Sequence, residues 1–75
     1  MKIFGAGTGG EAFQELYEVG IQAKPDSLRE LAKFLEEMAS SLEKDIENFG
    51  HGHAKDFCEN WNDENPEIIV FNPNT

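Results

Sequence analysis

Residues 25–49 carry apolar side chains at the three- and four-residue spacing of an amphipathic helix, and charged residues fill the opposite side. Pro25 suits the first helical position, although Ser27 and Glu30 would also form a capping box that begins the helix two residues later. Gly50, directly after the last apolar position, is typical of a helix end. The pattern therefore predicts one long helix. Its apolar stripe consists of Leu28, Leu31, Leu35, Met38, Leu42, Ile46 and Phe49, with Ala32 and Ala39 beside it.

Two patterns near the N-terminus predict a hairpin. Residues 1–5 form a short strand that leads into a glycine-rich loop at residues 5–10. In residues 13–23, apolar and polar side chains alternate with the period of two that is typical of a half-buried strand. The first part of this segment would also fit one or two helical turns. The β-branched Val19 and Ile21 favour a strand.

The C-terminal third predicts a short helix and a buried strand. Helical spacing across residues 53–61 places four side chains on one side, namely Ala54, Phe57, Cys58 and Trp61. The apolar run in residues 67–72 is typical of a buried strand.

These elements, in the order β-β-α-α-β, predict a single α+β domain over residues 1–75. Because crossover connections are right-handed, the first strand should lie between the other two. We therefore expect a three-stranded antiparallel sheet of order 2-1-3. The long helix would pack on one face of this sheet, and the short helix or another chain would cover part of the other face.

Chain length, apolar content and cysteine count indicate which class of protein to expect. A chain of 75 residues builds only a small core, and its longest apolar run is far too short to cross a bilayer. Small secreted domains usually contain several disulfides, whereas this chain has one cysteine, Cys58. We therefore expect a cytoplasmic protein.

Charge is concentrated in the second half of the chain. The net charge is −9, and residues 36–75 hold ten acidic residues against Lys44 and Lys55. Residues 1–35 hold five acidic and four basic residues. An acidic field repels nucleic acid and anionic membranes and speeds association with a basic protein. The same charge could also serve solubility alone.

The spacing of Gly5, Gly7 and Gly10 matches the G-x-G-x-x-G pattern of dinucleotide-binding loops. That fold needs several βαβ units, and the segment after the glycines predicts a strand instead of a helix. A hairpin loop is the better interpretation, and we expect no cofactor.

Zinc-type donors occur at His51, His53 and Cys58, with Asp56 nearby. Structural zinc sites usually have four ligands, and the sequence has neither a Cys-x-x-Cys pair nor a second histidine pair. A thiol nucleophile with a histidine base is conceivable, but Cys58 falls on the apolar side of the predicted short helix. We predict no metal site and no enzyme.

Trp61, the single tryptophan, lies among acidic and amide residues. Its ring either closes the core against Phe57 or is an aromatic contact for a partner, surrounded by acidic residues.

The sequence resembles the small immunity proteins of bacterial polymorphic toxin systems in several segments. They are the opening M-K-I-F-G, the segment Y-E-V-x-I-Q-A, the helical L-R-E-L-A-K-F-L-E-E-M-A, and above all H-x-H-x-x-D-F-x-x-x-W followed by P-x-I-I-V-x-N-P. The resemblance implies a non-catalytic cytoplasmic antidote that binds a cognate toxin domain. The glycine-rich loop has no clear place in this pattern.

The sequence thus predicts a basic toxin domain as the partner of an acidic docking face. The partner-binding residues that we expect are Glu43, Glu47, His53, Asp56, Glu59, Trp61, Asp63 and Glu64. Two alternatives stay open. One is a structural or regulatory homodimer that pairs through the uncovered face or edge of the sheet. The other is a small zinc-binding protein.

Overall fold

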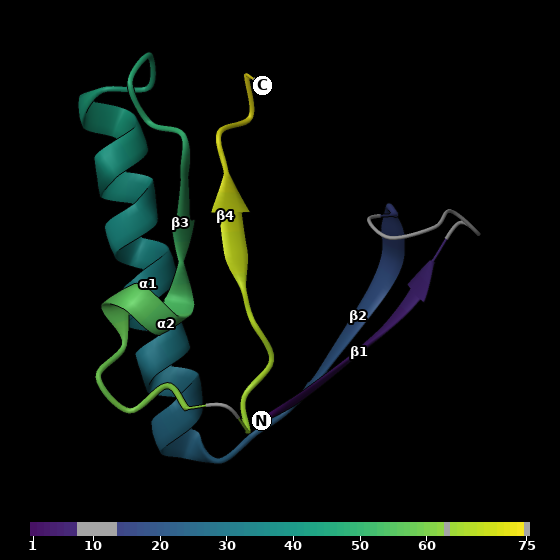
Figure 1. Cartoon of the computed structure of the whole chain (residues 1–75). Coiled ribbons are helices and arrows are strands. Elements are labelled where there is room, and N and C mark those ends of the chain that lie inside the picture. Colours follow the sequence, from purple (N-terminus) through teal and green to yellow (C-terminus); the bar gives the residue numbers. More distant parts are fainter. Residues whose placement is uncertain (8–13, 63, 75) are drawn as a thin grey trace.

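The structure is a computed structural model that describes residues 1–7, 14–62 and 64–74 (Figure 1). The predicted glycine-rich loop lies largely outside the described residues. The elements in chain order are β1 (Lys2–Gly7), β2 (Leu16–Gln22), α1 (Pro25–Lys44), β3 (His51–His53), α2 (Ala54–Phe57) and β4 (Ile69–Phe71).

The strands form two separate sheets, so the predicted three-stranded sheet of order 2-1-3 is wrong. β1 pairs with β2, and β3 pairs with β4, both antiparallel. The cause is an additional strand, β3, which the sequence did not predict. It pairs residue for residue with β4, from His51 opposite Phe71 to His53 opposite Ile69. The last strand therefore pairs with β3 and not with β1.

α1 begins at Pro25 and ends at Lys44, five residues before the predicted end. The side chain of Asp45 explains this early end. It accepts hydrogen bonds from the backbone N–H of Asn48 (3.3 Å) and from Asn48 Nδ2 (2.7 Å). Such local bonds offer the backbone an alternative to the helix. Ile46 therefore lies in a turn, and Phe49 lies in the segment that leads to β3.

The core lies where α1, α2 and the β3–β4 sheet meet. Phe34 is fully buried, and Leu31, Ala54 and Cys58 are buried around it. Partly buried side chains complete the cluster, namely Met1, Met38, Trp61, Ile68 and Val70. Phe34 was absent from the predicted stripe, whereas Leu28 and Leu35 of that stripe are exposed. The buried side of α1 is thus rotated from the predicted one.

α2 is one turn long instead of spanning residues 53–61. The backbone N–H of Ala54 donates to the carbonyl of Ile68 (2.9 Å), which fixes the start of α2 against the approach to β4. Cys58 ends α2 in an extended conformation. The chain after α2 runs back over the N-terminal half of α1, where Asn60 Nδ2 donates to Glu30 Oε1 (2.9 Å).

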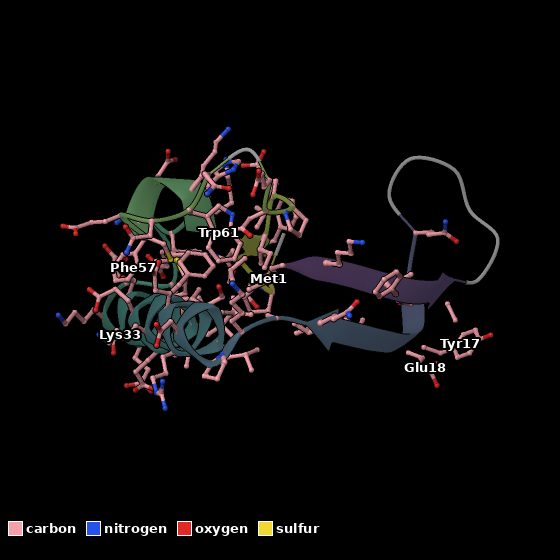
Figure 2. All side chains as sticks on the ribbon, turned by 90° about the horizontal axis from the view of Figure 1, so that it is seen from below. Met1, Tyr17, Glu18, Lys33, Phe57 and Trp61 are labelled. Atoms are coloured by element: carbon pink, nitrogen blue, oxygen red, sulfur yellow. The ribbon has the colours of Figure 1, made fainter. Side chains whose placement is uncertain are left out.

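The β1–β2 hairpin projects away from α1 and the β3–β4 sheet (Figure 1). All seven residues of β2 are exposed, including Tyr17, Val19 and Ile21. In Figure 2, Tyr17 and Glu18 lie far from Phe57 and Trp61. The described residues of the hairpin therefore bury little apolar surface against the rest of the molecule. No helix among the described residues has the length and apolar character needed to span a membrane.

Candidate functional site

The structure divides the predicted docking residues into separate groups. Glu43 lies near the C-terminal end of α1, and Glu47 in the turn that follows. Asp56 lies on α2, and Glu59 lies just after it, where it lines one groove with Glu30 from the first half of α1. Glu43 is thirteen positions after Glu30 on α1, which corresponds to about 20 Å along the axis. The two acidic groups thus lie at different levels of α1. Asp63 lies outside the described residues.

Trp61 is half-buried and packs against the core cluster. Its indole Nε1 donates a hydrogen bond to the carbonyl oxygen of Pro66 at 3.0 Å. A buried indole usually finds such a partner. Of the two roles that the sequence left open for Trp61, this geometry favours the one that closes the core.

His53 belongs to a polar cluster on β3 and the approach to β4. Its Nδ1 lies 2.5 Å from Glu67 Oε1, and Lys55 Nζ lies 3.4 Å from the same oxygen. The hydrogen bond from His53 and the nearby Lys55 charge lower the pKa of Glu67, with the hydrogen bond as the main cause. The ring of His51 contacts that of His53 edge-on, with the centroids 4.9 Å apart. This cluster fixes His53 on Glu67.

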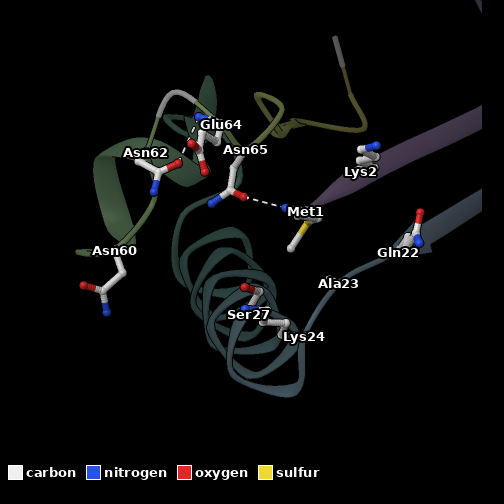
Figure 3. Close-up of a pocket in the computed structure, with 10 residues that line it drawn as sticks. All are labelled: Met1, Lys2, Gln22, Ala23, Lys24, Ser27, Asn60, Asn62, Glu64 and Asn65. Atoms are coloured by element: carbon white, nitrogen blue, oxygen red, sulfur yellow. Dashed lines mark hydrogen bonds between the residues drawn. The ribbon is translucent and has the colours of Figure 1, made fainter.

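Glu64 lies near the base of the hairpin, in an open hollow of about 630 Å³ (Figure 3). Here the terminal amine of Met1 donates to Asn65 Oδ1 at 2.9 Å, and the backbone N–H of Glu64 donates to Asn62 Oδ1. The lining also includes Lys2 and Lys24. Glu64 therefore shares this hollow with the terminal amine and two lysines, so the hollow is not a purely acidic surface.

A second groove, of about 330 Å³, lies between α1 and the segment after α2. Its lining consists of Glu30, Lys33, Phe57, Cys58, Glu59 and Asn60. The ring of Phe57 is 42% exposed here, and its inner side meets the buried Phe34 at a centroid distance of 6.0 Å. The groove thus has an aromatic side chain that is anchored in the core and still accessible.

Two carboxylates accompany this ring. Glu30 is half-buried and held by Asn60, while Glu59 is exposed on the rim. A carboxylate has about four acceptor sites, so the bond from Asn60 leaves Glu30 with further acceptor capacity. Figure 2 shows Lys33 and Phe57 on the side of the molecule away from the hairpin. We call Glu30, Asp56, Phe57 and Glu59 the α2 acidic face.

Phe57 and Glu30 were missed as candidate site residues. Phe57 was expected on the inner side of a helix over residues 53–61, but the helix ends at Phe57 itself. Glu30 was noted only as a capping residue. The crossing of the segment after α2 over α1, which brings Asn60 to Glu30, is a tertiary contact without a local sequence signal.

Neither zinc binding nor thiol chemistry gains support from the described residues. Among them, no three histidine, cysteine, aspartate or glutamate side chains converge on one point. Cys58 is buried in the core, with its Sγ 3.7 Å from the carbonyl oxygen of Glu30. Burial, and next the charge of Glu30, raise the pKa of the Cys58 thiol, which disfavours the reactive thiolate.

Neither the curated proteins nor the solved structures include a match to this chain. The family Immunity protein 32 matches residues 18–73, which include most of β2 and all later elements. β1 lies outside the matched range. This finding confirms the resemblance seen in the sequence, and the chain belongs to the Immunity protein 32 family.

Proposed function

We propose that this protein neutralises a bacterial toxin by binding the toxin domain, and that it does so without catalysis. Membership in an immunity protein family is the observation that supports this function best. The net charge of −9 favours a basic partner, because opposite charge speeds the diffusional encounter. The cytoplasm, where an antidote meets an incoming or newly made toxin, is the location that this function requires.

The α2 acidic face is the docking surface that we propose. It combines an accessible aromatic ring with the carboxylates of Glu30 and Glu59, which line the same groove as Lys33, and the exposed Asp56 precedes the ring in α2. Aromatic side chains that are held rigidly at the centre of an interface often dominate its binding energy, and surrounding charges steer the encounter. Phe57 therefore takes the central role that the sequence suggested for Trp61. Glu43 and Glu47 would contact the same toxin only if it extends along α1.

We expect the cognate toxin domain to be encoded beside this chain's gene, and the test uses that domain. We expect Phe57→Ala to weaken binding about tenfold or more, mainly through faster dissociation. The double reversal Asp56→Lys with Glu59→Lys should slow association about tenfold at low salt. Binding kinetics and protection of growing cells against the toxin are the two measurements.

The hairpin supplies a matched control. Glu15→Lys with Glu18→Lys makes the same change in net charge at exposed positions remote from α2. We expect this control to retain most of the association rate. Equal effects of the two double reversals would place the docking surface elsewhere, and failure of the wild-type chain to bind or protect would contradict the proposed function itself.

The homodimer that the sequence left open was to pair through the uncovered face or the edge of a three-stranded sheet. The described strands form two two-stranded sheets instead, so the face expected for this pairing does not form.

A further inference from the structure

α1 presents an apolar stripe to solvent in addition to the side that it buries. The stripe consists of Leu28, Ala32, Leu35, Ala39 and Leu42, which we call the α1 seam. Leu28 and Leu35 are 44% and 46% exposed. Both alanines are also exposed, and Leu42 is half-buried. Leu31 and Phe34 point to the core instead, so the seam lies beside the buried side of the helix.

The seam has the spacing of a coiled coil. Its residues follow one another at alternating intervals of four and three positions, and Ile46, which is 37% exposed, continues the series just beyond the helix. Two helices with this repeat can pack their stripes against each other. From Leu28 to Leu42 the seam extends about 21 Å along the helix. It is long enough for several layers of contact with another helix.

The charges that border the seam identify its partner. Arg29, Glu36 and Glu43 occupy every seventh position along its outer border. The border is therefore positive toward the N-terminal end and negative toward the C-terminal end. When two such helices pack antiparallel, these borders lie next to each other, with Arg29 of each copy close to Glu43 of the other. The charge pattern is complementary to itself.

Size complementarity leads to the same arrangement. Antiparallel packing that joins Arg29 to Glu43 places Ala32 opposite Leu42 and Leu35 opposite Ala39 of the second copy. Large side chains then meet small ones, which allows close packing of the two helices. In a parallel arrangement, the border with Arg29, Glu36 and Glu43 would instead face the opposite border of the seam on the second helix. Leu31 and Met38 occupy that opposite border and pack into the core of their own copy, so they offer no charged partner.

We propose that a second copy of this chain docks on the α1 seam, so that the protein forms an antiparallel two-fold dimer through α1. This assembly does not depend on the toxin-binding function. A single pair of short helices makes a small interface, so we expect a dissociation constant on the order of 10⁻⁵ M. In this dimer, Glu36 lies closest to the two-fold axis and faces Glu36 of the second copy. The two like charges repel each other and therefore weaken the dimer.

Sedimentation velocity on the purified chain alone tests this proposal. Across concentrations from about 1 to 500 µM, which span the expected dissociation constant, the protein should change from monomer to dimer. Leu35→Lys should leave it monomeric throughout. Val19→Lys is the matched control, because it introduces the same charge at an apolar hairpin residue that is 54% exposed. This variant should dimerise as the wild type does. Circular dichroism verifies that both variants remain helical.

Charge variants identify the orientation. Arg29→Glu and Glu43→Arg should each weaken dimerisation severalfold, and their combination in one chain should restore it, because the complementary pairs are re-formed. Arg29 also contacts Asp26 within α1 (3.2 Å), so melting curves must verify the fold of the single variants. Glu36→Gln should strengthen the dimer, an effect that damage to the fold would not produce. A wild-type chain that stays monomeric, or a double variant without restoration, would overturn the proposal.

Discussion

Asn72 shows how one buried polar side chain connects two ends of this fold. Its Nδ2 donates to the carbonyl oxygens of Ile46 (2.5 Å) and Phe49 (2.7 Å), in the turn that follows α1. Its Oδ1 accepts a hydrogen bond from the backbone N–H of Asn74 (2.8 Å), and its own N–H donates to the carbonyl of Gly50. Asn72 therefore holds the chain after β4 against the turn before β3.

We expect Asn72→Asp to lower the free energy of unfolding by about 3 kcal/mol, because a buried carboxylate would replace a donor that serves two carbonyl groups. Chemical denaturation followed by circular dichroism measures the change. Asn74→Asp is the control, since it makes the same substitution at an exposed position. It should change stability by less than about 0.5 kcal/mol. Equal losses in both variants would mean that negative charge, and not the lost donor, is responsible.

Glu67 offers a second residue-scale prediction. Its pKa is lowered from the ordinary 4.5, first by the hydrogen bond with His53 and to a smaller extent by Lys55. His53→Ala should therefore raise the Glu67 pKa toward its ordinary value, and Lys55→Met should raise it less. Carboxyl chemical shifts in an NMR titration report both values. If Lys55→Met had the larger effect, charge and not the hydrogen bond would control this group.

The sign of the pH dependence follows from this shift. A carboxyl group whose folded-state pKa is lowered stabilises the fold above its unfolded pKa, and this contribution is lost as the pH falls through the folded value. The Glu67 contribution should thus be present at neutral pH and disappear below about pH 4.5, the ordinary value of the group. In a Glu67→Gln variant, the pH dependence of stability should be flatter over this acidic range.

At the scale of elements, the hairpin and the core differ in what they contribute to stability. In the described part of the hairpin, five large apolar residues are each at least 46% exposed, namely Phe4, Leu16, Tyr17, Val19 and Ile21. An isolated two-stranded hairpin is marginally stable at best in water. The free energy of folding must therefore come mainly from the cluster around Phe34.

Phe34→Ala should cost about 3–5 kcal/mol and leave much of the chain unfolded, because Phe34 is fully buried. Val19→Lys should change the free energy of unfolding by less than about 0.5 kcal/mol, since Val19 is 54% exposed and lies in the projecting hairpin. Thermal and urea unfolding compare the two variants. A large loss in Val19→Lys would show that the hairpin packs against the rest of the molecule in solution.

The elements that could be predicted from sequence are those with a strong local signal. Pro25 and the apolar repeat indicate the start of α1, and alternation around Val19 indicates β2. β3 could not be predicted, because His51, Gly52 and His53 have no apolar alternation and glycine is disfavoured in strands. The structure explains the glycine, since a Cβ at residue 52 would collide with Met38 Sδ. This strand forms because it pairs with β4 and contacts α1. Both interactions are long-range in the sequence, so no local pattern predicts them.

At the scale of the whole molecule, the sequence resemblance indicated the family correctly, whereas the basic character of the partner stays a prediction. The family supports a toxin-binding role, and the resemblance in residues 51–73 was sufficient to suggest it. Acidic residues that are near in sequence do not form one surface. The segment after α2 contacts the N-terminal half of α1, whereas Glu43 and Glu47 lie at and beyond the C-terminal end of α1. The α2 acidic face depends on the hydrogen bond between Asn60 and Glu30. The pattern of apolar and polar residues along the chain does not predict this long-range contact.

The same net charge should act in opposite directions on the two proposed partners. Two copies that each carry −9 repel each other at long range, whereas a basic toxin is attracted. The Debye length falls from about 30 Å at 0.01 M salt to about 3 Å at 1 M, so added salt weakens both effects. The exposed Arg29–Glu43 pairs would offset only a small part of this repulsion, because exposed ion pairs contribute little.

Raising the salt concentration from about 0.02 to 0.5 M should therefore strengthen dimerisation severalfold and slow toxin association about tenfold or more. Sedimentation of the chain alone and stopped-flow mixing with the toxin domain measure the two responses in the same buffers. If dimerisation weakened with salt, the attractive border pairs would outweigh the net repulsion. If toxin association did not respond, the acidic residues would serve solubility, and the encounter would depend on apolar contacts such as Phe57.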